Sequence, residues 1–143
     1  MKRILIIDDD KLLNKIHEKV LVAAGVAHEL HITTNGLDGI NYLKSRITNN
    51  DLLPEIIILD LHMPVMNGLQ FLDEFQKLDF TGKHEIEFVV FTSSTSVRDK
   101  QNAISRGIKH YLKKPYILRG LVDIISKLDA GRNNLKLSDS ALT

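Results

Sequence analysis

Three uninterrupted runs of large apolar residues constrain the fold of this chain more than any other feature: Ile4–Ile7, Ile56–Leu59 and Phe88–Phe91. Strands that are apolar throughout are typically covered on both faces, as in a parallel sheet. A weaker run spans Ile108–Leu112, and His28–Thr33 alternates between polar and apolar residues, as a strand at a sheet edge does. Together the runs predict a sheet of five strands.

The segments between these runs have the three- and four-residue apolar spacing of helices. The apolar stripes are Leu12, Leu13, Ile16, Val20 and Ala23; Leu37, Ile40 and Leu43; Leu69, Leu72, Phe75 and Leu78; and Ile117, Leu118, Leu121, Ile124, Ile125 and Leu128. Ser96 and Asp99 form a capping pattern at the start of a further helix over Val97–Arg106. The alternation of strand and helix predicts an α/β fold, a doubly wound five-stranded parallel sheet with helices on both faces.

Polar residues follow the predicted strands, at the sheet edge where functional groups of this fold class gather. These residues are Asp8, Asp9 and Asp10 after the first run, Asp60 after Ile56–Leu59, Thr92 and Ser93 after Phe88–Phe91, and Lys113, Lys114 and Pro115 after the last run. One aspartate of the triplet is explained equally well as a helix N-cap. Two carboxylates ~4 Å apart repel by about 4 kcal/mol at an effective dielectric constant near 20, so the cluster favours a bound cation. Oxygen ligands without cysteine predict Mg²⁺ rather than a softer metal.

Asp60 is the candidate nucleophile, because a strand-end carboxylate beside a metal can attack phosphorus and form an aspartyl phosphate. Lys114 would supply positive charge to the phosphoryl group and Thr92 a hydroxyl donor. Taken singly, Lys114 and Pro115 are also explained as a turn, and Thr92–Ser96 as a polar loop before a helix. The ordered appearance of all these groups at successive strand ends favours the shared chemical role.

Charge and cysteine content exclude several function classes. Lys and Arg number 19 and Asp and Glu 18, so no global field draws the chain to nucleic acid or a membrane, and no cysteine is present. The first residues lack the roughly 20 apolar positions of a membrane span. These features predict a cytoplasmic protein.

With these motifs the chain resembles the receiver domain of two-component response regulators, over about residues 2–130. The motifs are ILIIDD, LDLHMPVMNG, VVFTSS and YLKKP. The resemblance implies a flavodoxin-like sheet of order 2-1-3-4-5. It also implies that Asp60 is the phosphoacceptor, and that Mg²⁺ is bound by Asp8, Asp9, Asp60 and the backbone carbonyl of His62, with Asp9 the more direct ligand. Lys114 would contact the phosphoryl group.

The resemblance also implies switch residues. Thr92 would move to meet the phosphoryl group, Tyr111 would turn inward on activation, and Pro115 would follow a cis peptide bond. The side chains of His62 and Ser94 would overlook the approach of water to the phosphorus and tune dephosphorylation.

The resemblance implies a phosphoacceptor rather than an enzyme, with a histidine kinase or histidine phosphotransfer protein as donor and an unknown protein downstream. We expect a receiver domain over residues 1–130 and a flexible tail over 131–143, too short for a DNA-binding output domain. The longer segments Ile47–Pro54 and Asp79–Glu87 resemble stand-alone receivers that serve phytochrome-like kinases. Pairing of two copies as a homodimer stays open, as does the choice between switch and relay.

Two other classes fit less well. Haloacid-dehalogenase-like enzymes also use a strand-end aspartate, but their second aspartate, two residues later, is replaced here by His62. Flavodoxin-like electron carriers have a phosphate loop rich in Ser, Thr and Gly, where Asp8–Asp10 would repel the phosphate.

Overall fold

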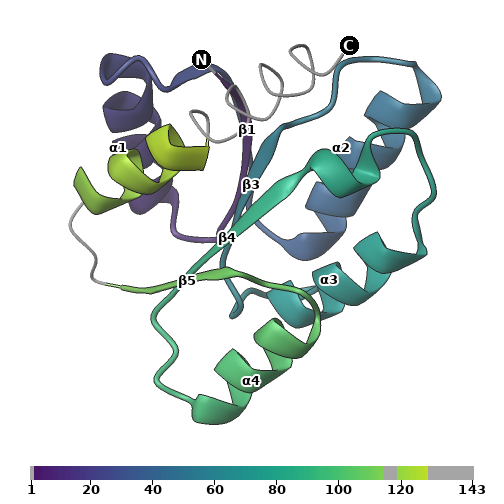
Figure 1. The fold of residues 1–143 in the computed structure, drawn as a ribbon. Coiled ribbons are helices and arrows are strands. Elements are labelled where there is room, and N and C mark those ends of the chain that lie inside the picture. Colours follow the sequence, from purple (N-terminus) through teal and green to yellow (C-terminus); the bar gives the residue numbers. More distant parts are fainter. Residues whose placement is uncertain (1, 115–118, 129–143) are drawn as a thin grey trace, which may run out of the picture.

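The computed structural model describes residues 2–114 and 119–128. Five parallel strands form one sheet of order β2-β1-β3-β4-β5, which confirms the predicted fold class and order (Figure 1). The strands are β1 (Lys2–Ile7), β2 (Ala27–Thr33), β3 (Ile56–Leu59), β4 (Glu87–Thr92) and β5 (His110–Lys113). The helices are α1 (Lys11–Ala23), α2 (Gly36–Thr48), α3 (Gly68–Lys77), α4 (Val97–Ser105) and the short 3₁₀ helix η1 (Lys83–Glu85), and residues 119–128 are also helical.

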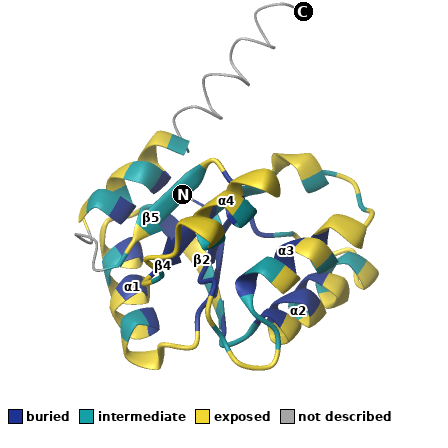
Figure 2. Ribbon diagram, turned by 90° about the horizontal axis from the view of Figure 1, so that it is seen from below, coloured by how far each residue is buried: buried dark blue, intermediate teal, exposed yellow. Residues whose placement is uncertain are grey.

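The sheet separates two apolar cores, which explains why its central strands are apolar throughout. Leu5 and Ile7 of β1 face the core beneath α2, α3 and α4. Ile4 and Ile6 face the opposite core, beneath α1 and helical residues 119–128. Figure 2 shows the buried positions on the strands and on the helix sides that face them. Continuous burial on both faces therefore confirms the parallel sheet that the apolar runs predict.

Strand β2 lies at the sheet edge, where its alternating pattern predicts it. It pairs with β1 alone among the described strands. Glu29 and His31 are exposed, whereas Leu30 and Ile32 pack against the core beneath α1. The alternation thus reflects a strand with one solvated side.

The buried side of α1 differs from the predicted stripe. Leu12 is 71% exposed and Ile16 is 38% exposed, whereas Asn14, His17 and Leu21 are buried. The helix is rotated because its polar side chains make contacts below it. Asn14 Nδ2 donates to the carbonyl oxygen of Asp8 at 2.7 Å, and the His17 ring packs edge-on against Phe91 with a centroid distance of 5.2 Å.

The apolar stripe predicted for α2 is also wrong at one end, because Leu37 is 40% exposed. The buried residues of this helix are Gly36, Gly39, Ile40 and Leu43. Two small residues, Gly36 and Gly39, bring this helix close to its neighbours. A Cβ on Gly39 would lie 2.7 Å from Ile7 Cδ1. A count of large apolar residues does not detect a helix face that packs through glycine.

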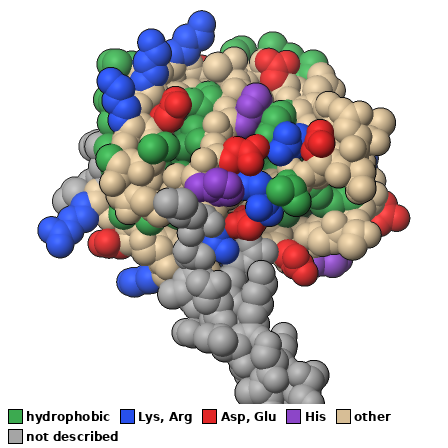
Figure 3. All heavy atoms as spheres, turned by 90° about the horizontal axis from the view of Figure 1, so that it is seen from above, with side chains coloured by type: hydrophobic (Ala, Val, Ile, Leu, Met, Phe, Trp, Pro, Cys, Tyr) green, Lys and Arg blue, Asp and Glu red, His purple; other side chains and the backbone are tan. Residues whose placement is uncertain are grey.

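Within the described residues, no helix combines the length and apolarity needed to cross a lipid bilayer. On the face shown in Figure 3, acidic and basic side chains both appear among apolar ones, in keeping with the near balance of charge. Predictions for Pro115, Ile117, Leu118 and the tail 131–143 fall on residues outside the described part of the chain.

Candidate functional site

Two aspartates are buried side by side at the carboxyl ends of β1 and β3. Asp8 is 3% exposed and Asp60 is 5% exposed. The two strands pair in parallel, and the Asp60 amide donates to the Ile7 carbonyl at 2.9 Å. This register brings together side chains that are 52 residues apart in sequence.

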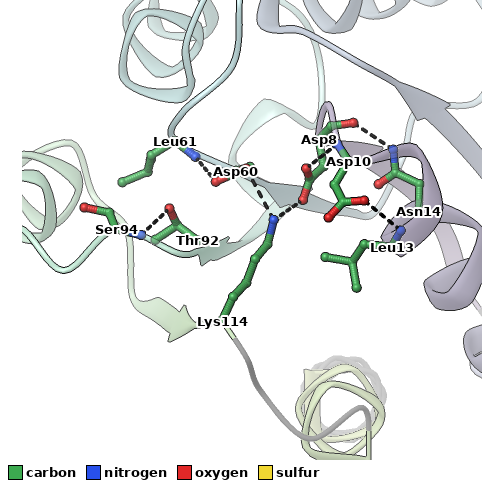
Figure 4. Close-up of polar contacts among 9 residues, drawn as sticks. All are labelled: Asp8, Asp10, Leu13, Asn14, Asp60, Leu61, Thr92, Ser94 and Lys114. Carbon is green, nitrogen blue, oxygen red and sulfur yellow. Dashed lines mark hydrogen bonds and ion pairs between the residues drawn. The ribbon is translucent and has the colours of Figure 1, made fainter.

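Lys114 joins these two carboxylates. Its Nζ lies 2.7 Å from Asp8 Oδ2 and 3.3 Å from Asp60 Oδ2, and Figure 4 shows the ammonium between them. Burial raises the pKa of the Asp8 carboxyl, against the lowering effect of its hydrogen bond with Lys114. Burial also works to lower the pKa of Lys114, but its bonds to Asp8 and Asp60 prevail and raise it. Lys114 is therefore a cation held in place by the acidic pair.

Asp9 completes an acidic group that fits a divalent cation. Carboxylate oxygens of Asp8, Asp9 and Asp60 lie within 4.8 Å of one another. Three ionised carboxylates and one ammonium leave two negative charges, which a divalent ion would neutralise. Asp9 is exposed, and no described residue donates a hydrogen bond to its carboxylate, so its oxygens are available. Oxygen donors of this kind are those that Mg²⁺ prefers.

Asp10 has the structural role considered for one member of the triplet. Its Oδ1 accepts from the Leu13 amide at 3.0 Å and caps α1. Its own amide donates to Asp8 Oδ1 at 3.0 Å. The N-cap explanation thus applies to Asp10, whereas Asp8 and Asp9 belong to the acidic site.

Thr92 lies at the end of β4, fully buried. Its Oγ1 accepts from the Ser94 amide at 3.2 Å (Figure 4). Its carbonyl accepts from the Lys114 amide at 2.7 Å. The hydroxyl therefore holds the start of the β4–α4 connection, while the backbone of the same residue holds Lys114.

Tyr111 is half-buried and packs against the core beneath α2, α3 and α4. Its hydroxyl oxygen is buried beside Ser94: burial raises the pKa of the Tyr111 hydroxyl, and hydrogen bonding with Ser94 opposes that rise. The ammonium of Lys100 on α4 lies 5.7 Å from the ring centroid. The ring is thus partly inside the molecule in this structure, and its predicted inward turn on activation stays a prediction.

His62 and Ser94 meet on a residue whose side chain the sequence analysis did not identify. His62 Nε2 lies 2.8 Å from Asp99 Oδ2, and Ser94 Oγ donates to the same oxygen at 2.6 Å. The capping pattern predicts Asp99 only as part of the start of α4, where its amide donates to Ser96 Oγ at 3.2 Å. No sequence signal shows that its carboxylate reaches a histidine 37 residues earlier.

Gly68 is a second residue of the site that sequence reasoning did not assign. A Cβ there would lie 2.2 Å from the carbonyl oxygen of Asp60. The Gly68 amide donates to the Leu61 carbonyl at 2.9 Å, so α3 begins directly against the backbone of the candidate phosphoacceptor. The glycine in LDLHMPVMNG is therefore required by close approach rather than by an unusual backbone angle.

Comparison with known proteins agrees with this geometry. The family model for the response regulator receiver domain matches residues 4–126. The chain is 30% identical over 124 residues to the sensor histidine kinase CheAY of Helicobacter pylori, covering 87% of this chain and 14% of that protein. It is 32% identical over 128 residues to the nitrate/nitrite response regulator protein NarL of Escherichia coli K12, covering 90% of this chain and 55% of that protein. The chain thus spans about half, or much less, of these curated relatives.

Solved structures show the same fold. The Mn(2+)-bound form of response regulator Rcp1 matches with a TM-score of 0.73 at 27% identity, covering 91% of this chain and 93% of that one. A DNA-binding response regulator of the LuxR family from Staphylococcus aureus matches with a TM-score of 0.74 at 26% identity, covering 90% and 98%. The chain belongs to the response regulator receiver domain family, whose members are phosphorylated in two-component signalling.

Proposed function

We propose that this receiver domain takes a phosphoryl group onto Asp60 from a histidine kinase or a histidine phosphotransfer protein. The observation that carries the proposal is the buried Asp60 carboxylate, held 3.3 Å from the Lys114 ammonium and beside two further aspartates. Burying a carboxylate among so many charges costs folding stability, so a structural role alone does not explain it. A carboxylate in this position can attack phosphorus.

The transfer forms one bond and breaks another. An Asp60 oxygen bonds to the phosphorus of a phosphohistidine as the phosphorus–nitrogen bond breaks, and the histidine nitrogen keeps the bonding pair. Asp60 Oδ1 accepts from the Leu61 amide at 2.7 Å, which orients the carboxylate in its plane. Lys114 supplies positive charge near Asp60 Oδ2. This charge would offset the negative charge that the phosphoryl group adds to the aspartates.

Asp8, Asp9, Asp60 and the His62 backbone carbonyl are the ligands that we assign to Mg²⁺. The ion would neutralise the acids and the phosphoryl oxygens during transfer. Three observations support this assignment: oxygen ligands, a net charge of minus two with Lys114 included, and an Asp9 carboxylate without a described partner. The related Rcp1 has been solved with Mn(2+) bound.

The response to phosphorylation follows from the Thr92 hydroxyl. Its Oγ1 accepts from the Ser94 amide, so turning the hydroxyl toward a phosphoryl oxygen releases the start of the β4–α4 connection. The buried Tyr111 hydroxyl, which lies beside Ser94, is in the region that would rearrange. We expect beryllofluoride, a phosphoryl mimic, to change hydrogen exchange between Thr92 and Lys114 first. The output is then an altered protein contact or onward relay of the phosphoryl group.

A phosphatase or phosphotransferase of the haloacid dehalogenase type is the alternative. Its general acid would occupy position 62, where this chain has a histidine that is 63% exposed and bonded to Asp99. That histidine is turned toward α4, which favours a regulatory phosphoacceptor over an enzyme that turns over a substrate.

Incubation with a small-molecule phosphodonor, followed by intact-mass measurement, tests the proposal. We expect one phosphoryl group in the presence of Mg²⁺ and none with a chelator or in Asp60→Asn. Asp10→Asn is the matched control, because asparagine also caps helices and the residue lies outside the proposed ligand set. Equal labelling of Asp60→Asn and the wild type would contradict the assignment.

A further inference from the structure

The carboxylate of Asp99 connects the two loops that flank the proposed phosphoacceptor. His62 lies in the connection after β3 and Ser94 in the connection after β4, and these strands are paired neighbours. Both side chains bond to Asp99 Oδ2, at 2.8 Å and 2.6 Å. Asp99 itself lies in the first turn of α4. A single oxygen therefore joins two loops and a helix.

This carboxylate is better shielded than the ring it holds. The Asp99 side chain is 21% exposed, against 63% for His62. The hydrogen bond from Ser94 lowers the pKa of Asp99 most, burial opposes it, and the bond and charge of His62 lower the pKa further. An ionised carboxylate at the start of a helix is also favoured by the helix dipole. Asp99 is thus a fixed acceptor, and the His62 ring is the movable partner.

The bond sets the hydrogen positions on the ring. An ionised carboxylate can only accept, so His62 Nε2 must carry the hydrogen that it donates to Asp99. In the neutral ring Nδ1 is then an acceptor, and no described residue donates to it. Removing Asp99 would free the ring to change both its tautomer and its orientation.

We infer that Asp99 is a positioning residue, which holds the ring of His62, two residues after Asp60, and thereby sets the lifetime of the phosphorylated state. The inference rests on the proposed roles of Asp60 and His62. In the hydrolysis that ends this state, a water oxygen bonds to phosphorus as the Asp60–phosphorus bond breaks. The Asp60 carboxylate keeps the bonding pair, and dihydrogen phosphate leaves with both hydrogens of the water. His62 acts on the approach of that water, and Asp99 acts through His62.

A double-mutant cycle of phosphoryl decay tests this inference. The wild type, Asp99→Ala, His62→Ala and the double variant are phosphorylated with the same small-molecule donor and followed by intact mass after the donor is removed. We expect Asp99→Ala to change the decay rate about threefold or more when His62 is present. In the His62→Ala background it should cause no further change.

Asp73→Ala is the matched control. It also removes a carboxylate that joins two helices, since Asp73 on α3 bonds to Arg106 after α4 at 2.8 Å, but it does not contact His62. This variant should decay at the wild-type rate. An Asp99→Ala effect that persists in the absence of His62, or that Asp73→Ala reproduces, would overturn the inference.

Nitrogen-15 shifts of the His62 imidazole give a readout that does not depend on phosphorylation. The wild type should show the form with hydrogen on Nε2, and Asp99→Ala should show a mixture of tautomers. A wild-type ring with hydrogen on Nδ1 would contradict the role of Asp99 even if decay rates differ. Failure to label Asp60 in every variant would instead overturn the proposed function.

Discussion

Replacing Gly68 with alanine should damage both the stability and the proposed chemistry of this domain. Gly68 is the first residue of α3. An added Cβ would lie 2.2 Å from the Asp60 carbonyl oxygen, 2.8 Å from Leu61 Cα and 3.0 Å from the Asp60 carbonyl carbon. Ordinary contacts begin at 3.4 Å, and all three obstacles are backbone atoms that cannot rotate away. The substitution must therefore displace the backbone of Asp60 or the start of α3.

Two effects of opposite sign decide the magnitude. Helix propensity alone favours alanine over glycine by about 1 kcal/mol. Overpacking costs about 1–3 kcal/mol, and the upper end applies where backbone must move. We therefore expect Gly68→Ala to lose about 2 kcal/mol of unfolding free energy, or about 8 °C in Tm for a domain of this size.

Thermal unfolding and phosphodonor labelling should be measured together. Gly107→Ala is the control, because a Cβ there has no atom within 4 Å, while its φ of +91° makes alanine strained. That strain costs about 1–2 kcal/mol and should leave labelling intact. Gly68→Ala should lose both stability and labelling. If it melts at or above the wild-type temperature and labels normally, the close approach at Asp60 has been misjudged.

Three further predictions concern the charged and buried groups. Mg²⁺ at ten times its Kd should raise the unfolding free energy by about 1.4 kcal/mol in thermal melts, and an equal gain in Asp9→Ala would argue against Asp9 as a ligand. In the presence of a chelator, Lys114→Met should lose about 3 kcal/mol of unfolding free energy, because the buried carboxylates lose their counter-charge. Mg²⁺ should restore part of that free energy, and an equal loss with and without Mg²⁺ would contradict this role of Lys114. Burial lowers the pKa of His17 to about 4, whereas the unfolded chain takes up the proton near 6.5, so denaturant titrations should show stability falling from about pH 6.5 to pH 4. The decrease in unfolding free energy should approach about 3 kcal/mol and should disappear in His17→Leu. If the pH dependence of stability is unchanged in that variant, other groups cause it.

The fold was predictable because a parallel sheet requires strands that are apolar on both faces. Ile56–Leu59 shows this requirement directly, since all four of its residues are buried. The phase of α1 was not predictable from apolar spacing. Asn14 and His17 are buried there because the Asp8 carbonyl and the Phe91 ring lie beneath them, and one of those partners follows β1 whereas the other lies in β4.

The central part of the site was predictable for a similar reason. Side chains that follow parallel strands must share one edge of the sheet, which places Asp8, Asp60, Thr92 and Lys114 together. The bridge through Asp99 depends instead on how α4 lies relative to the connection after β3. Sequence spacing carries no information about that orientation, so the carboxylate was expected only as part of a helix start.

The most direct test of Asp60 as phosphoacceptor locates the phosphoryl group on the chain. The purified protein is phosphorylated with a small-molecule donor and Mg²⁺, and the acyl phosphate is reduced with borohydride, which converts the modified aspartate to homoserine. Peptide mass spectrometry then identifies the converted residue. We expect conversion at Asp60 alone among the aspartates of the chain. Conversion at Asp8, Asp9 or another acid, with Asp60 unchanged, would contradict it.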